Sequence, residues 1–180
     1  MSISKENEYN TLRNEILNEI QMQTNLRVAM VTVSIAILSL TFDNGSPNLL
    51  LLNFAIIIML RMLIHSKQFG TFKLSAYIVV RFERNSEDLK WESIASKCKL
   101  IGKDMILLNK IRIIGYYFAS ILGMITTILY ISSLKSEANL CWFNVIIVVV
   151  CMMIILFLDF GFNYDKIRES YINEFEKILK

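Results

Sequence analysis

Residues able to carry acid–base, nucleophilic or metal chemistry are sparse in this 180-residue chain. Its one histidine, His65, cannot form a two-histidine metal site within a single copy. Glu92 beside Trp91 is an isolated carboxylate, which is typical of a solvated side chain, and no Gly-rich phosphate-binding loop is present. The three cysteines follow no metal-ligand spacing: Cys98, Cys141 and Cys151. We therefore expect no catalytic residues, no metal and no cofactor, and predict that the protein is not an enzyme.

Three polar side chains interrupt or adjoin apolar segments, namely Asn53, Arg61 and Asp159. Ionisable residues inside a membrane are candidates for ion or proton pathways. Arg61 and Asp159 both lie near the same expected membrane boundary, so they can pair with each other or sit among lipid headgroups. Transporters typically have broken helices or internal repeats, and neither is apparent in this sequence. Anchoring and helix packing are therefore the expected roles.

The elements that would position these residues are four apolar blocks in a chain that is 54% hydrophobic. The blocks are Val28–Phe42, Leu49–Ile64, Ile113–Leu134 and Leu140–Leu158. A membrane-spanning helix needs about 17–25 residues, which the last two blocks reach and the first two do not. The first two blocks can therefore form a buried hairpin of a soluble protein or a hairpin that enters the bilayer obliquely. The brief polar turn between them favours two spanning helices. The pattern predicts an all-α polytopic membrane protein with four transmembrane helices in two hairpins.

The distribution of basic residues predicts the orientation. Of the 19 Lys and Arg residues, only Lys135 lies in a hairpin loop. Cationic segments stay in the cytoplasm, so we expect a multi-pass protein of the bacterial inner membrane with both ends and the middle segment inside. The predicted segments are a cytoplasmic N-terminal helix (1–27), the first hairpin (28–64), a cytoplasmic helical loop (65–112), the second hairpin (113–158) and a cytoplasmic C-terminal helix (159–180).

The cytoplasmic segments have apolar residues at helical spacing. Glu6–Arg27 lacks Gly and Pro, so a continuous helix of about 37 residues into the first span is expected, roughly 55 Å at 1.5 Å per residue. Its acidic face disfavours contact with anionic lipid. The segment Leu74–Phe82 fits a strand or a helix, and a lone strand would lack a partner, so helix is predicted. Asp165–Lys180 is predicted to be an amphipathic helix. The apolar residues expected to face a protein partner are Tyr9, Leu12, Ile16, Ile20, Tyr171 and Phe175.

Two further patterns lie along the third apolar block. Small residues recur every fourth position at Gly115, Ala119, Gly123 and Thr127, which predicts a close helix-packing face. Its partner can be another span of the same chain or a second subunit. A basic cluster precedes the block and is expected either to contact lipid headgroups or only to fix the topology: Lys97, Lys99, Lys103, Lys110 and Arg112.

Several short motifs resemble small membrane proteins of bacterial defence loci. They are Tyr9-x-x-Leu12-Arg13-x-Glu15-Ile16, Tyr77-Ile78 and Trp91-Glu92. The layout is most similar to the membrane subunit of the Kiwa antiphage system, and less so to multi-span effectors of nucleotide-signalling and retron systems. The resemblance implies a homo-oligomeric inner-membrane component that works with a cytoplasmic protein.

These observations leave two functional hypotheses open. The first is a non-enzymatic scaffold or sensor subunit that recruits a cytoplasmic partner in antiphage defence. The second is a pore-forming or membrane-depolarising effector, which an oligomer of short helices rich in small residues would form. The net charge of +3 is too small to indicate direct binding of nucleic acid.

Overall fold

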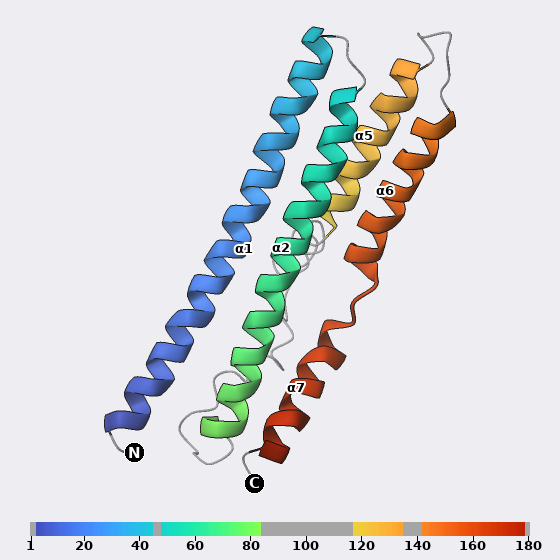
Figure 1. Cartoon of the computed structure of the whole chain (residues 1–180). Helices are drawn as coiled ribbons and strands as arrows, with labels where there is room; N and C mark the ends of the chain where they lie inside the picture. The colour runs from blue at the N-terminus through green and yellow to red at the C-terminus, as the bar shows by residue number, and fades with distance from the viewer. Residues whose placement is uncertain (1–2, 45–47, 84–116, 135–141, 179–180) are drawn as a thin grey trace, which may run out of the picture. The chain divides into compact units, whose positions relative to one another are not determined.

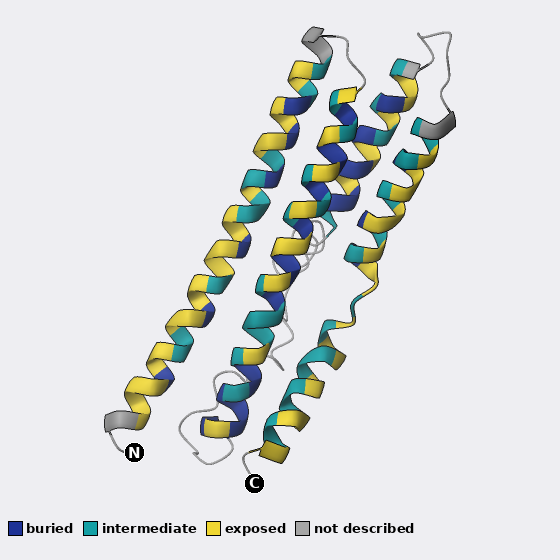
Figure 2. Ribbon diagram, in the orientation of Figure 1, coloured by how far each residue is buried: buried dark blue, intermediate teal, exposed yellow. Residues whose placement is uncertain are grey.

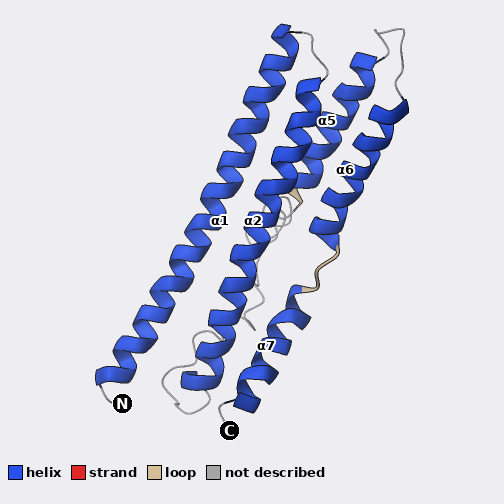
Figure 3. Ribbon diagram, in the orientation of Figure 1, coloured by secondary structure: helices blue, strands red, loops and turns tan. Residues whose placement is uncertain are grey.

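In the computed structural model of the chain, the described residues are 3–44, 48–83, 117–134 and 142–178, and they are almost entirely helical (Figure 1 and Figure 3). The elements are α1 (Ile3–Asn44), α2 (Asn48–Ile78), the π-helix η1 (Val79–Glu83), α5 (Phe118–Leu134), α6 (Trp142–Phe160) and α7 (Tyr164–Ile178). No strand occurs within these ranges. The helical prediction for Leu74–Phe82 is therefore confirmed, and the strand alternative is wrong.

Helix α1 is the continuous element that the sequence predicts. It runs for 42 residues, about 63 Å at 1.5 Å per residue. Five of its buried residues recur at every seventh position, namely Tyr9, Ile16, Gln23, Met30 and Ile37, and Ser34 is buried beside them. A repeat of seven keeps one seam of a helix against its neighbours. This seam, more than local helix propensity, therefore accounts for so long a helix.

Helix α2 does not stop where its apolar block ends. It continues through His65 without a break and reaches 31 residues before the wider turns of η1. His65, Gln68 and Ser75 are buried although they are polar, so the packed face of the helix extends beyond the apolar residues. The rest of the helical loop expected up to residue 112 lies outside the described residues.

Two of these helices, α1 and α2, are long and apolar enough to cross a membrane, and α6 and α7 count as a third if they form one bent span. Helix α5 is a shorter apolar helix of 17 residues. The chain is thus a helical protein with two to three candidate membrane-spanning helices in its described residues.

The chain divides into two compact units. The apolar unit has as its described residues 25–44, 48–64, 117–134 and 142–162. The terminal unit has 3–24, 65–83 and 163–178. Helices α1 and α2 contribute to both units, whereas α5 and α6 belong to the first and α7 to the second.

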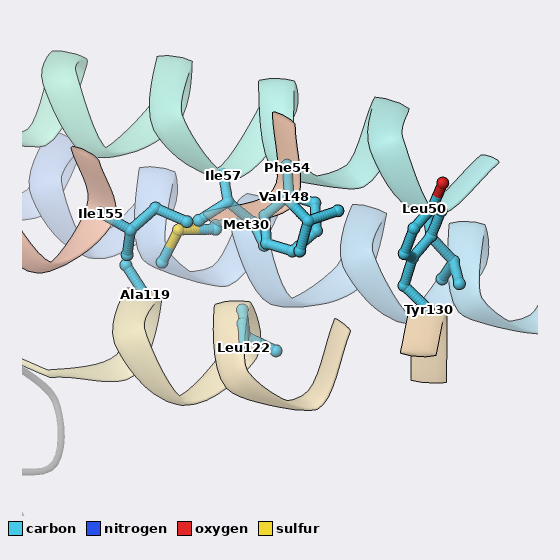
Figure 4. Close-up of a cluster of buried hydrophobic side chains, with 9 residues drawn as sticks. All are labelled: Met30, Leu50, Phe54, Ile57, Ala119, Leu122, Tyr130, Val148 and Ile155. Atoms are coloured by element: carbon cyan, nitrogen blue, oxygen red, sulfur yellow. The ribbon is translucent and has the colours of Figure 1, made fainter. Parts of the chain in front are cut away.

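Four helices share the core of the apolar unit (Figure 4). Phe54 and Ile57 of α2 are fully buried there, together with Ile155 of α6. The remaining members come from all four helices: Met30, Leu50, Ala119, Leu122, Tyr130 and Val148. Close packing of these side chains gains dispersion energy at each contact between the helices.

The terminal unit has a smaller core between the start of α1 and the end of α2. Tyr9 meets Phe82 edge to face, with ring centroids 5.7 Å apart, and Ile16 and Ile78 complete the cluster. Helix α7 joins through Phe175, whose ring lies 5.5 Å from that of Tyr77. None of the residues of α7 is buried, as the teal and yellow ribbon in Figure 2 shows.

The small-residue row on α5 packs against α6 of the same chain. Ala119 is buried, and a methyl group added to Gly123 would lie 3.1 Å from Ile155 Cδ1 and 3.1 Å from Met152 Sδ. Gly115 lies outside the described residues. Of the two partners that the sequence left open, the row thus meets a helix of its own chain at Gly123.

Replacement of Gly123 by leucine should therefore force α5 and α6 apart. Overpacking of this kind costs about 1–3 kcal/mol, so we expect Gly123→Leu to lower the unfolding midpoint of the detergent-solubilised protein. Gly70→Leu is the matched control, because no atom lies within 4 Å of the position of its added Cβ. Equal midpoints for the two variants would show that the α5–α6 contact at Gly123 does not form.

Candidate functional site

The apolar unit reverses the usual distribution of polarity. Among the described residues, all but four of the large exposed apolar side chains lie in this unit, the exceptions being Leu17, Ile20, Met22 and Ile178. Its buried polar residues are Ser34, Asn53, Arg61, Ser120, Thr126 and Asp159. A soluble protein would place these groups the other way round, whereas a surface that meets lipid must be apolar.

A buried ion pair joins three helices of this unit. The Nε atom of Arg61 on α2 lies 2.6 Å from Oδ1 of Asp159 on α6, and the two side chains are only 2% and 0% exposed. The second carboxylate oxygen, Oδ2, accepts the backbone N–H of Ser120 at 3.0 Å and also the Ser120 hydroxyl.

The position of Ser120 in the first turn of α5 makes this arrangement favourable. The first N–H groups of a helix have no partner within the helix and carry partial positive charge. Asp159 therefore neutralises Arg61 and caps α5 with a single carboxylate. Asp159 and Arg61, which the sequence offered as either paired or solvated by headgroups, lie together.

A second polar contact links α2 to α5. The side-chain amide of Asn53 donates to the hydroxyl of Thr126 at 2.9 Å, and this hydroxyl donates in turn to the carbonyl of Leu122 at 2.8 Å. Thr126 thus accepts a hydrogen bond from an amide of α2 and donates one to a carbonyl of its own helix, α5. The exposed Thr32 hydroxyl likewise donates to the carbonyl of Val28 at 3.0 Å.

The terminal unit contains polar contacts of a different kind. Lys67 and Glu19 form an ion pair at 3.1 Å with partly exposed side chains. Gln23 donates to Thr71 at 3.1 Å. These contacts place hydrogen-bonding groups along the seam between α1 and α2, where apolar residues would otherwise be expected.

The lone histidine also finds its partner in the terminal unit. His65 is buried, and its Nδ1 atom hydrogen-bonds the hydroxyl of Tyr164 at 2.9 Å. The two rings stack with centroids 6.0 Å apart and an interplanar angle of 19°. Among the described residues there is no group of three His, Cys, Asp or Glu side chains that could hold a metal ion.

The structure corrects the expectation that the apolar stripe of α1 faces a protein partner. Tyr9 and Ile16 are each 5% exposed, and Leu12 packs against the same cluster, so the chain's own α2 and η1 cover them. The reason is that periodicity identifies a buried face without identifying what buries it. Ile20 remains 46% exposed.

The other predicted site residues fall into two groups. Tyr171 and Phe175 are partly exposed on α7, and Phe175 packs on Tyr77. The basic cluster that precedes α5, and the Trp91-Glu92 pair, lie outside the described residues.

Sequence reasoning did not identify Ser120 or Thr126, which complete the two polar contacts of the apolar unit. Ser120 had one available signal, because a hydroxyl in the first turn of a helix commonly takes part in capping. Thr126 lies next to the small-residue row but points to α2, and nothing in its spacing indicates that partner.

Comparison of the chain with protein-family models, with curated proteins and with solved structures finds no match. The functional argument therefore depends on the geometry and on the residues themselves.

Asp159→Asn removes the counter-charge of Arg61 but keeps the shape of the side chain. Loss of one member of a buried pair costs about 3–5 kcal/mol, so we expect a clear fall in the unfolding midpoint in detergent. The double variant Arg61→Leu/Asp159→Leu should restore most of the lost unfolding midpoint, because neither buried charge is then present.

Glu19→Gln is the matched control, since a partly exposed pair contributes about 0–1 kcal/mol. If Asp159→Asn is no more harmful than Glu19→Gln, the ion pair is not part of the folded apolar unit.

Proposed function

We propose that the chain is an integral protein of the bacterial inner membrane that spans the bilayer four times, as two hairpins. The inverted polarity of the apolar unit supports this, because four helices there enclose an ion pair and expose apolar side chains. Helix α6 has 19 residues and α5 has 17, which is at the lower end of the range of about 17–25 that a span needs. The sequence continues the α5 block with apolar residues from Ile113.

Both ends and the middle segment lie in the cytoplasm in this proposal. The near absence of Lys and Arg from the hairpin loops supports this orientation. The segments assigned to the cytoplasm contribute the described residues of the terminal unit, so this unit is the cytoplasmic part of the protein.

The protein acts as a non-enzymatic scaffold or sensor subunit that oligomerises and recruits a cytoplasmic protein. The observation that carries this proposal is the terminal unit itself. Three separate chain segments build a unit with its own core, its own ion pair and a partly buried His65–Tyr164 contact. Spanning a bilayer requires none of these, whereas a binding platform does. The resemblance to the Kiwa membrane subunit supports a role in antiphage defence.

The outer side of α7 is the part of the terminal unit best suited to a cytoplasmic protein. A shallow depression there is lined by charged and polar side chains of both signs: Lys166, Glu169, Ser170, Asn173, Glu174 and Lys177. Mixed charges of this type give specificity and steer association. Since α7 has no buried residue, its charges can be changed without disturbing a core.

The alternative is a pore-forming or membrane-depolarising effector. The observation that favours it is the presence of Asn53, Arg61 and Thr126 inside the apolar unit, where a polar path would have to run. In the described structure these groups are occupied with one another or with Asp159, which favours the scaffold.

The orientation can be tested by labelling single cysteines in intact cells with a reagent that cannot cross the membrane. We expect Asn44→Cys and Ser136→Cys to react from outside, and Lys177→Cys, the control, to react only after the membrane is opened. Each background would carry Cys98, Cys141 and Cys151 replaced by alanine. Reaction of Asn44→Cys or Ser136→Cys only from inside would rule out the two-hairpin topology.

The scaffold role predicts capture of a cytoplasmic protein by the detergent-solubilised chain. The products of neighbouring genes are the candidates, and Lys166→Glu/Lys177→Glu should reduce capture several-fold, while Lys73→Glu, a charge reversal at an exposed position of α2, leaves it unchanged. Liposomes carrying the protein should remain tight to a trapped dye. Leakage without capture would favour the pore-forming alternative instead.

A further inference from the structure

A groove of about 180 Å³ lies in the apolar unit, between the last turns of α5 and the first turns of α6. Its floor is formed by Tyr130 and Val148, which are buried members of the apolar core in Figure 4. Its rim is formed by Ile131, Val149 and Met153, which are 47%, 56% and 63% exposed. The groove therefore opens onto the outer surface of the unit. We call it the α5–α6 groove.

The packing of the two helices explains why this space is left unfilled. One turn earlier on α5 the helices approach closely, since a methyl group added to Gly123 would lie 3.1 Å from Met152 Sδ. The row of small residues then ends at Thr127, because Ile131 occupies the next position of the row. Residues branched at Cβ keep a preferred rotamer in a helix, so Ile131 and Val145 are not free to turn into the space.

The walls of the α5–α6 groove favour a hydrocarbon ligand over water. The described residues present only apolar surface to it. The hydroxyl of Thr127 donates to the carbonyl of Gly123 at 2.8 Å and is thus used within α5. A water molecule in such a site needs about two to four polar partners, whereas an apolar cavity of about 150 Å³ stays dry and takes up an apolar guest.

The size of the groove selects a slender ligand. Sites for drug-sized molecules have about 300–1,000 Å³, well above the volume of this groove. An α-helix with its side chains is about 10–12 Å across, so a helix of another protein could insert only single side chains. A hydrocarbon chain can extend along the groove, and the flexible side chains of Met152 and Met153 can adjust to it.

The position of the groove identifies the source of such a chain. It is lined by residues 127–131 of α5 and 145–153 of α6, next to the loop that the proposed topology places outside the cell. In that topology its rim faces the acyl chains of the outer leaflet, which surround the protein at high concentration. A space without partner atoms loses the dispersion contacts of its walls, and an acyl chain supplies them.

We propose that the α5–α6 groove binds one acyl chain of a phospholipid of the outer leaflet. This inference rests on the proposed membrane topology. The bound chain contacts both helices of the second hairpin, where they do not fill the space between them. The lipid is therefore held at this site more firmly than the lipids that meet the convex surface of the unit.

Native mass spectrometry of the full-length protein tests the site. The chain would be inserted into vesicles of phosphatidylethanolamine and phosphatidylglycerol and then extracted with mild detergent. We expect one retained phospholipid per chain, identified by the added mass. Thr127→Phe and Val145→Phe should each lower the retained fraction several-fold, because the ring occupies the groove. Ile128→Phe and Ile146→Phe are the matched controls, since they add the same ring to the same helices at exposed positions outside the groove.

The outcomes separate this inference from the proposed function. Equal retention in the groove variants and the controls would overturn the site, and so would a retained free fatty acid in place of a phospholipid. A lipid-free dimer that Thr127→Phe dissociates would show a second copy in the groove and also overturn it. Insertion into vesicles without a retained lipid contradicts only this inference, whereas failure of the chain to insert contradicts the proposed topology as well.

Photo-labelling of the unaltered chain provides a measurement that does not depend on the folding of any variant. A phospholipid with a diazirine midway along one acyl chain would be irradiated in the same vesicles. Residues 127–131 and 145–153 should be labelled several-fold more than Leu40 of α1 and Leu52 of α2. Both leucines are 51% exposed, and each lies four residues from the hairpin end of its helix. Equal labelling of the groove and these leucines would overturn the proposal.

Discussion

The apolar unit is governed by the need to give its buried charges partners inside the chain. The side chains of Arg61 and Asp159 are buried, and the exposed large side chains described in this unit are apolar, so each charge needs a partner within the unit. The carboxylate of Asp159 provides these partners at one point. It pairs with the guanidinium of Arg61 and accepts the backbone N–H and the hydroxyl of Ser120 at the start of α5. The packing of Phe54 and Ile57 on α2 with Ile155 on α6 can then bring these two helices close together without leaving a charge unpaired.

The long elements followed from the sequence because their signals are local and repeated. The absence of Gly and Pro up to Asn44 indicated one helix, and α1 extends from Ile3 to that residue. For Leu74–Phe82 the alternation of apolar residues fitted two structures, and the lack of any pairing strand correctly favoured the helical one. Amphipathic spacing after Asp165 likewise predicted α7, which is confirmed from Tyr164 to Ile178.

What the sequence did not provide was the identity of partners across helices. The apolar stripe of Tyr9 and Ile16 indicated a buried face, but the residues that cover it, Ile78 and Phe82, lie in the segment that the sequence assigned to a cytoplasmic helical loop. The small residues at Ala119 and Gly123 indicated close packing, and only the structure identifies α6 as the neighbour at Gly123. Such contacts join residues remote in sequence, which periodicity does not encode.

The contact between Arg61 and Asp159 has a consequence for biogenesis. Arg61 leaves the ribosome long before Asp159, and at about 5–20 residues per second the interval is several seconds. In the proposed two-hairpin topology, α2 carries an unmatched guanidinium during that time. The ion pair then forms only when the second hairpin has been made. The order of translation thus determines when the three helices that share this contact can assemble.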